Sequence, residues 1–254
     1  AKIDPTTNTV VGSGDVAGTA TRVMRTATAI WITNYNGGEL IRVDPASNSV
    51  LSRIPFPGPD GLAKDGGTLI VSSYDERFVG RLDPASKQTT QRVGVGGNPT
   101  AVIVDDQFGI WAAVYDTGEL VQIDPATFTV TQRVAVGAGP VGLALSPSGL
   151  WVANHEAGTV VKVDMATGEV LASVEVGAGP TEIVAVGGSM WVTVTDSGEL
   201  VQIDGGSVDI VTRTPVGGTG MGGGPTGISA ASGTLWVAVV SEQSVVRVDP
   251  DAIG

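Results

Sequence analysis

The chain has 254 residues, no cysteine and a formal net charge of −12 at pH 7. This length suits one large domain with a substantial core, and the absence of cysteine excludes disulfides and thiolate metal sites. The negative charge argues against nucleic acid and anionic membranes as partners, and no apolar run is long enough for membrane insertion. Because the chain begins at Ala1 instead of Met, we expect a mature or excised piece of an extracytoplasmic or secreted protein.

A short apolar phrase recurs through the chain and predicts its β-strands. It consists of a hydrophobic run around one large residue, a short polar loop, and a second run that ends in Asp. The large residue falls at Trp31, Ile70, Trp111, Trp151, Trp191 and Trp236. The closing Asp falls at Asp4, Asp44, Asp83, Asp124, Asp164, Asp204 and Asp249. A period of about 40 residues built only from short apolar runs and turns is typical of a β-propeller, with one four-stranded blade per repeat.

The repeat that begins at Gly139 predicts four strands, over residues 139–145, 150–153, 159–163 and 169–176. The second of them is continuously apolar, as expected for a strand buried on both faces. The fourth alternates apolar and polar residues, as expected for a half-buried outer strand. The sequence Asp-Pro-Ala-Thr at residues 124–127 predicts a β-turn between the third and outer strands of its repeat. In such a turn Asp accepts backbone N–H groups and Pro presets φ.

Counting the strands predicts an all-β, six-bladed propeller that occupies residues 1–254 as a single domain. The last repeat, from Thr226 to Pro250, lacks an outer strand, whereas the N-terminus carries a spare one over Asn8 to Val11. We therefore expect the N-terminal strand to complete the last blade, which would remove an open sheet edge.

Positions at which the repeats disagree are the better candidates for function. The residue four places after the large apolar position, here named the ring position, follows the second strand of its blade and is occupied by Tyr35, Tyr74, Tyr115, His155, Thr195 and Val240. The next residue, here named the acid position, is Asn36, Asp75, Asp116, Glu156, Asp196 or Ser241. Aromatic bodies with polar tips are good recognition surface, and the acids beside them could hold a cation or a basic group. The structural alternative is an aromatic residue that packs at the end of its strand beside a solvated acid.

A second set of exceptions lies where the chain enters the first strand of each blade. Thr followed by a small residue is the default there, and the charged exceptions are Arg22, Asp60 and Glu182. Charged side chains around a predicted central channel need solvent or partners, so these three residues are further ligand-binding candidates. Direct contact between Arg22 and Glu182 would have to span several blades.

Two other patterns are less specific. Glu39, Glu119 and Glu199 each open a Gly-Glu-Leu third strand in alternate blades, which indicates either a two-blade ancestral unit or a threefold acidic set. The glycine-rich insertion over residues 217–225 lacks the Lys-Ser/Thr and the helix of a phosphate-binding loop. We expect it to be a flexible loop over the functional face, where it could act as a lid.

The strings GPVGLA at 139–144, LWVAN at 150–154 and VDMATG at 163–168 resemble the NHL and YVTN-type bacterial β-propellers. The resemblance implies a binding, sensing or scaffolding module, and some relatives resemble extracellular sensor regions. Streptogramin B lyases are similar more distantly. The resemblance to those lyases implies a magnesium ion with His residues after the first-strand Pro, but this chain has no His there. Asp60 in Pro-Asp-Gly-Leu matches one motif of gluconolactonase-type enzymes, without the remainder of their calcium set.

These observations predict a non-enzymatic recognition or sensor domain that binds a protein or small polar ligand through its loops between second and third strands. The predicted ligand-binding residues are Tyr35, Tyr74, Tyr115, His155, Asp75, Asp116, Glu156, Asp196, Asp60, Arg22 and Glu182. We expect no catalytic residues, no cofactor and a monomer. The alternative is a metal-assisted lyase or hydrolase, for which a divalent cation would use Asp60 and Glu182 together with His155 and Glu156.

Overall fold

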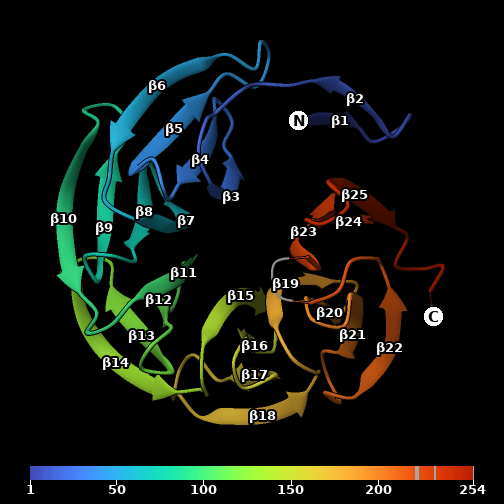
Figure 1. The fold of residues 1–254 in the computed structure, drawn as a ribbon. Helices are drawn as coiled ribbons and strands as arrows, with labels where there is room; N and C mark the ends of the chain where they lie inside the picture. Colours follow the sequence, from blue (N-terminus) through green and yellow to red (C-terminus); the bar gives the residue numbers. More distant parts are fainter. Residues whose placement is uncertain (221–222, 232, 254) are drawn as a thin grey trace. The chain divides into compact units, whose positions relative to one another are not determined.

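The computed structural model describes residues 1–220, 223–231 and 233–253. The described residues form 25 β-strands and no helix (Figure 1). Accordingly, a helix of sufficient length and hydrophobicity to cross a bilayer is absent from the described part of the chain. The chain divides into two compact units, Ala1–Val104 and Asp105–Gly254. The prediction of a single domain stays a prediction.

Five consecutive four-stranded sheets and one three-stranded sheet make up the chain after its N-terminal hairpin. This arrangement is a six-bladed β-propeller, as the repeat predicted. The first blade contains β3 (Ala20–Arg25), β4 (Ile30–Asn34), β5 (Glu39–Val43) and β6 (Val50–Pro55). The second contains β7 (Pro59–Asp65), β8 (Thr68–Ser73), β9 (Phe78–Asp83) and β10 (Gln88–Gly94). The third contains β11 (Pro99–Asp105), β12 (Gly109–Val114), β13 (Glu119–Asp124) and β14 (Thr129–Ala135).

The remaining blades repeat the same order of antiparallel strands. The fourth contains β15 (Pro140–Ser146), β16 (Gly149–Asn154), β17 (Thr159–Val163) and β18 (Val170–Glu175). The fifth contains β19 (Pro180–Val186), β20 (Ser189–Val194), β21 (Glu199–Asp204) and β22 (Ile210–Pro215). The sixth contains β23 (Pro225–Ala231), β24 (Thr234–Val239) and β25 (Ser244–Val248). The strand bounds predicted for the repeat at Gly139 agree with β15–β18 to within one residue at each end.

The N-terminal strands form a hairpin of their own, with β1 (Lys2–Asp4) paired to β2 (Thr9–Gly12). The strand β25 pairs with β24, and the sheet of the sixth blade has three strands. The expected pairing of the N-terminal strand with the last blade is therefore not among the strand pairings of the described residues. Since β2 and β25 belong to different units, the completion of the last blade by β2 stays a prediction.

The second strand of each blade forms the centre of the core. Every residue of β12 and β16 is buried, as is typical of strands that are covered on both faces. In the first unit Trp31 of β4 packs with Leu69 and Val71 of β8. In the second unit Trp151 of β16 packs with Ile183 and Val192 of the fifth blade. Trp is thus a structural residue of the repeat, as the internal comparison indicated.

The recurrent Asp closes the turn between the third and outer strands. The Oδ1 of Asp124 accepts the backbone N–H groups of Ala126 and Thr127 at 3.0 and 2.7 Å. Asp204 makes the equivalent bonds to Gly206 and Ser207 although no Pro follows it. The turn therefore depends on the carboxylate and does not require the proline. These hydrogen bonds lower the pKa of both carboxyl groups, since they favour the ionised form.

Candidate functional site

A four-residue turn follows the second strand of every blade, and its first two residues are the ring and acid positions. In each blade this turn lies at the same end of the sheet as the entry into the first strand. In the first, second, fourth, fifth and sixth blades a hydrogen bond joins the two, from the ring-position N–H to the carbonyl of the residue directly before the first strand. The bonds run from Tyr35 to Thr19, Tyr74 to Gly58, His155 to Gly139, Thr195 to Gly179 and Val240 to Gly224, at 2.7 to 3.3 Å.

The glycine before the first strand is needed for two reasons. Gly139 has a φ of +66°, which an L side chain rarely adopts. A Cβ at this glycine would also lie 2.8 Å from Cγ of Glu156. Gly58 has a φ of +48° and is covered in the same way by the carboxylate of Asp75. The acid position therefore packs over the glycine of its own blade, which holds the carboxylate in a defined place.

In the first unit, the ring-position tyrosine of one blade donates to the acid of the next. The hydroxyl of Tyr35 donates to Oδ1 of Asp75 at 2.7 Å, and its ring meets that of Tyr74 edge to face, with centroids 6.1 Å apart. The hydrogen bond to Asp75, followed by burial, raises the pKa of Tyr35 to about 12. Tyr35 is therefore a protonated hydrogen-bond donor at neutral pH and is unsuited to act as a base.

The second unit repeats this contact between Tyr115 and Glu156. The hydroxyl of Tyr115 donates to Oε1 of Glu156 at 2.9 Å, and the two residues are 41 positions apart in sequence. Tyr115 is half-buried and Glu156 is exposed. The sequence predicted that acids and tyrosines share a surface, but the pairing of each tyrosine with the acid of the following blade is visible only in the structure. Both side chains are consequently held in place before any ligand arrives.

The fourth and fifth blades lack this contact between a ring position and the following acid position. His155 occupies the ring position and Asp196 the following acid position, and both side chains are half-buried. Within the described part of the chain, Nδ1 of His155 and Oδ1 of Asp196 are buried and have no hydrogen-bond partner. The hydrogen bond between Tyr115 and Glu156 thus has no counterpart between His155 and Asp196 in the described part of the chain. Unpaired buried polar atoms are uncommon and mark a place for water, an ion or a ligand.

The surroundings of this gap are ordered and polar. Thr195 is buried, and its hydroxyl donates to the carbonyl of Pro225 at 2.9 Å and lies 2.7 Å from the hydroxyl of Thr181. The glycine-rich insertion contacts the same turn, since the N–H of Gly220 donates to the backbone carbonyl of Asp196 at 3.1 Å. The whole insertion over residues 217–225 was predicted to be a flexible lid. Because its residues 221–222 lie outside the described residues, the lid stays a prediction.

The charged residues at the first-strand entries are distributed over both units. In the first unit, Asp60 and Arg22 are half-buried neighbours. Burial raises the pKa of the Asp60 carboxyl, while the Arg22 guanidinium and a hydrogen bond from Thr21 act in the opposite direction. Glu182, in the second unit, is half-buried beside Thr193, whose hydroxyl accepts its backbone N–H at 3.0 Å. Arg22 and Asp60 thus lie together in the first unit, and Glu182 belongs to the second unit.

The three Gly-Glu-Leu glutamates are explained by ion pairs within their own blades. Each pairs with an arginine of the adjacent outer strand, 14 residues later: Glu39 with Arg53, Glu119 with Arg133 at 3.1 Å, and Glu199 with Arg213 at 3.2 Å. A threefold acidic site is therefore not needed to account for them. The recurrence of Arg at the same spacing was a sequence signal that could have identified these pairs.

The donor set decides whether a divalent cation fits. Among the described residues no three His, Cys, Asp or Glu side chains converge as they do around a bound metal. His155, Glu156 and Asp196 of the second unit do not form such a group.

Comparisons with known proteins support the fold. No protein-family model and no curated protein sequence matches the chain. Among solved structures, hydrazine synthase of Kuenenia stuttgartiensis is similar with a TM-score of 0.82 and 18% identity, over 95% of this chain and 81% of that one. A streptogramin B lyase structure gives 0.78 and 15%, over 92% and 80%. A catalytically inactive virginiamycin B lyase from Staphylococcus aureus with quinupristin gives 0.79 and 14%, over 92% and 82%. Identities this low show a shared fold, and the NHL or YVTN assignment is not confirmed.

Proposed function

We propose that the chain is a non-enzymatic recognition domain that binds a small polar ligand, or a polar group of a protein, on its ring-position loops. The single observation that carries this proposal is the gap between His155 and Asp196, where two buried polar atoms have no partner among the described residues. A ligand that supplies the missing hydrogen bonds would gain free energy that the unliganded protein has already lost by burying those atoms.

The charges around the gap favour a basic group as its occupant. Asp196 offers a carboxylate oxygen that can only accept hydrogen bonds when it is ionised. Glu156, fixed by Tyr115, stands beside His155 in the same turn. The chain as a whole carries a net charge of −12, which would attract cations and repel anions. We therefore propose an ammonium or guanidinium group, such as a lysine or arginine side chain, as the moiety that is bound.

The test is a titration with three capped amino acids, N-acetyl-lysine amide, N-acetyl-arginine amide and N-acetyl-glutamine amide, followed by NMR of the His155 imidazole. His155 is the only histidine of the chain, so its ring signals are assigned without ambiguity. We expect saturable shifts with at least one basic probe and none with glutamine. Asp196→Asn should weaken binding by about tenfold, because a charge-assisted hydrogen bond is replaced by a neutral one.

The matched control is Asp209→Asn. Asp209 is an exposed acid of the same blade, located at the opposite end of the sheet in the turn before β22. The Asp209→Asn substitution removes the same charge at a distance from His155 and Asp196, so the affinity for the basic probes should stay within about twofold. The proposal would be refuted if none of the probes shifts the imidazole, or if both variants weaken binding equally.

A second candidate, a metal-assisted lyase or hydrolase, is favoured by two observations. The chain shares its fold with streptogramin B lyase and virginiamycin B lyase, and burial raises the pKa of Asp60, as is common for functional carboxyls. A thermal melt after EDTA treatment, with and without Mg²⁺, Ca²⁺ and Zn²⁺, tests it. A rise in midpoint with one ion that Asp60→Ala abolishes would favour the enzyme.

An extracytoplasmic or secreted location and a monomeric state complete the proposal. The acidic, cysteine-free composition is compatible with that location and is unfavourable for nucleic acid or anionic membrane partners. Size-exclusion chromatography with light scattering tests the monomer, for which a mass of 25.6 kDa is expected.

A further inference from the structure

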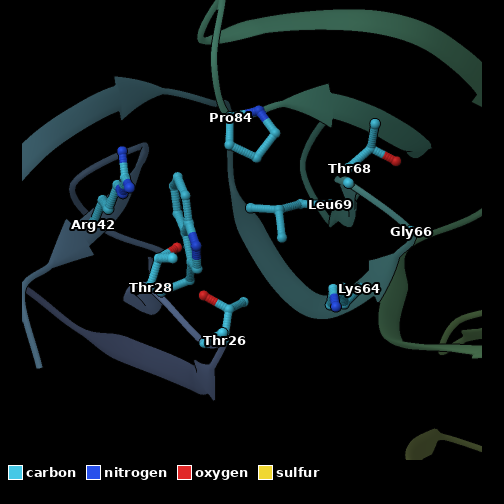
Figure 2. A pocket seen from close by; sticks show the side chains of 11 residues that line it. Thr26, Thr28, Arg42, Lys64, Gly66, Thr68, Leu69 and Pro84 are labelled. Atoms are coloured by element: carbon cyan, nitrogen blue, oxygen red, sulfur yellow. The ribbon is translucent and has the colours of Figure 1, made fainter.

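A cavity of about 230 Å³ lies in the first unit, between the first and second blades. It is at the opposite end of these sheets from the ring-position loops. Its walls include Thr26 and Thr28 of the loop between β3 and β4, the loop between β7 and β8, and Thr68 at the start of β8. Figure 2 shows Thr26, Thr28 and Arg42 on one side of the cavity and Lys64, Thr68 and Pro84 on the other.

The polar lining of this cavity is cationic. Arg42 and Lys64 line it together with hydroxyl groups, and none of its lining residues is Asp or Glu. This is unusual in a chain with 26 acids and 14 basic residues. Two cations without an acid form a site of positive potential, which attracts an anion.

Arg42 has no hydrogen-bond or ion-pair partner among the described residues. Its guanidinium lies over the ring of Trp31, with Cζ 5.7 Å from the centroid. Its Nε is buried and makes no hydrogen bond. Trp31 is only 3% exposed, so its ring is fixed by packing and positions the guanidinium that lies over it. A guanidinium with free N–H groups at a cavity wall is a ready donor to a carboxylate or phosphate.

Most of the residues at the position of Arg42 in the other blades form hydrogen bonds within the protein. Arg81 donates to Asp65 and Gln91 at 2.8 and 2.6 Å. Lys162 donates to the carbonyl of Gly205 at 2.9 Å and also lies over Trp151. The glutamines in this position, Gln122 and Gln202, donate to Phe108 and Ser189. Arg247 lies over Trp236 at 6.0 Å, like Arg42.

Arg42 therefore differs from the four residues that have partners within the protein. Arg42 also lines a cavity together with a second cation, Lys64. Lys64 is exposed and, like Thr28, has no hydrogen-bond partner among the described residues. Three polar side chains around one cavity thus have unused donors.

We infer that this cavity is a binding site for a small organic oxyanion, a carboxylate or a phosphate ester. Arg42 would bind the oxyanion from the Trp31 side, with Lys64 and Thr28 completing the donor set. The volume corresponds to about seven or eight waters at about 30 Å³ each, which suits a compact metabolite and excludes a whole nucleotide. The site is independent of the ring-position loops, so it is separable from the proposed function.

The test uses isothermal titration calorimetry of the intact chain with two probes, inorganic phosphate and succinate. Arg42→Gln should weaken binding by about tenfold or more, and Lys64→Gln by about threefold, since each removes one charged donor. Gln is the residue that pairs with Trp111 and Trp191 across the strands of the third and fifth blades, so Arg42→Gln should fold. Arg247→Gln is the matched control and should leave affinity within about twofold.

The two probes separate the sources of the oxyanion. Tighter binding of phosphate identifies a phosphoryl group, and tighter binding of succinate identifies a carboxylate; either supports the site. The inference is overturned if neither probe binds at 10 mM, roughly the weakest affinity of interest. It is also overturned if Arg247→Gln weakens binding as much as Arg42→Gln, because the effect would then be one of net charge.

Discussion

The hydrogen bond between Tyr35 and Asp75 can be measured directly. Its donor–acceptor distance is 2.7 Å, and the acceptor is a carboxylate. Hydrogen bonds to charged groups contribute about 1.5–3 kcal/mol when buried, but Asp75 is exposed and Tyr35 only half-buried. Solvent screening reduces the expected contribution to about 1 kcal/mol. A double-mutant cycle of Tyr35→Phe and Asp75→Asn in urea unfolding should therefore give a coupling free energy of about 1 kcal/mol.

The same contact has a spectroscopic signature. The pKa of Tyr35 is raised to about 12, first by the hydrogen bond to Asp75 and then by burial. Absorbance of tyrosinate near 295 nm in Asp75→Asn should show this pKa moving toward its ordinary value of 10.0. Because the folded-state pKa is raised, the stabilisation is fully present below about pH 10 and is lost as the pH rises toward 12. The chain has three tyrosines, and Tyr35→Phe identifies which step belongs to Tyr35.

Two results would refute this reasoning. A coupling energy below about 0.3 kcal/mol would mean that the contact does not persist in solution. A titration of the parent protein in which all three tyrosines ionise together near pH 10 would show that Asp75 does not hold the phenol. Far-UV circular dichroism at each pH ensures that the titration reports the folded protein.

Three further predictions concern the stability of the blades. Gly139→Ala should destabilise the fold by about 1–3 kcal/mol more than Gly187→Ala in urea unfolding, since both glycines have positive φ but only Gly139 has no room for a Cβ. Lys162→Met should cost about 1 kcal/mol in the same assay, because it removes the buried hydrogen bond to the carbonyl of Gly205. The pKa of Asp124 is lowered by hydrogen bonds from its turn, so its stabilisation is present above pH 3.8 and lost as the pH falls below it. Asp124→Asn should make thermal stability less dependent on pH in that acid range, as measured by differential scanning calorimetry.

The architecture could be predicted from the sequence because each blade is specified locally. The run from Thr159 to Val163 was predicted as a strand with the bounds that β17 has. The turn at Asp124 follows from one side chain that accepts the N–H groups of the next residues. Alternation and turn chemistry act over fewer than ten residues each, and the period of about 40 residues only repeats them, so no knowledge of distant contacts is needed.

The site was less predictable because its contacts join neighbouring repeats. The sequence selected Tyr35 and Asp75 as members of one surface, but their hydrogen bond links residues 40 positions apart. Similarly, the sequence shows a polar residue at Arg42 but not that it lacks a partner, since the partners of its equivalents come from different loops. Whether a side chain lacks a hydrogen-bond partner depends on three-dimensional packing, so a local sequence pattern does not predict it.

The gap at His155 gives the most direct test of recognition, because the repeat itself supplies the residue that would close it. Tyr occupies the ring position in three other blades, and in two of them its hydroxyl donates to the following acid at 2.7 and 2.9 Å. His155→Tyr should therefore donate to Asp196 and occupy the space where the proposed ligand binds. We expect this variant to be more stable by about 0.5–1.5 kcal/mol and to lose binding of the basic probes, measured by urea unfolding and by calorimetric titration. A structural histidine would give the opposite result, a loss of stability with no change in binding. The two quantities change in opposite directions only if the unpaired atoms of His155 and Asp196 are kept for a ligand, because selection for stability alone would favour the tyrosine.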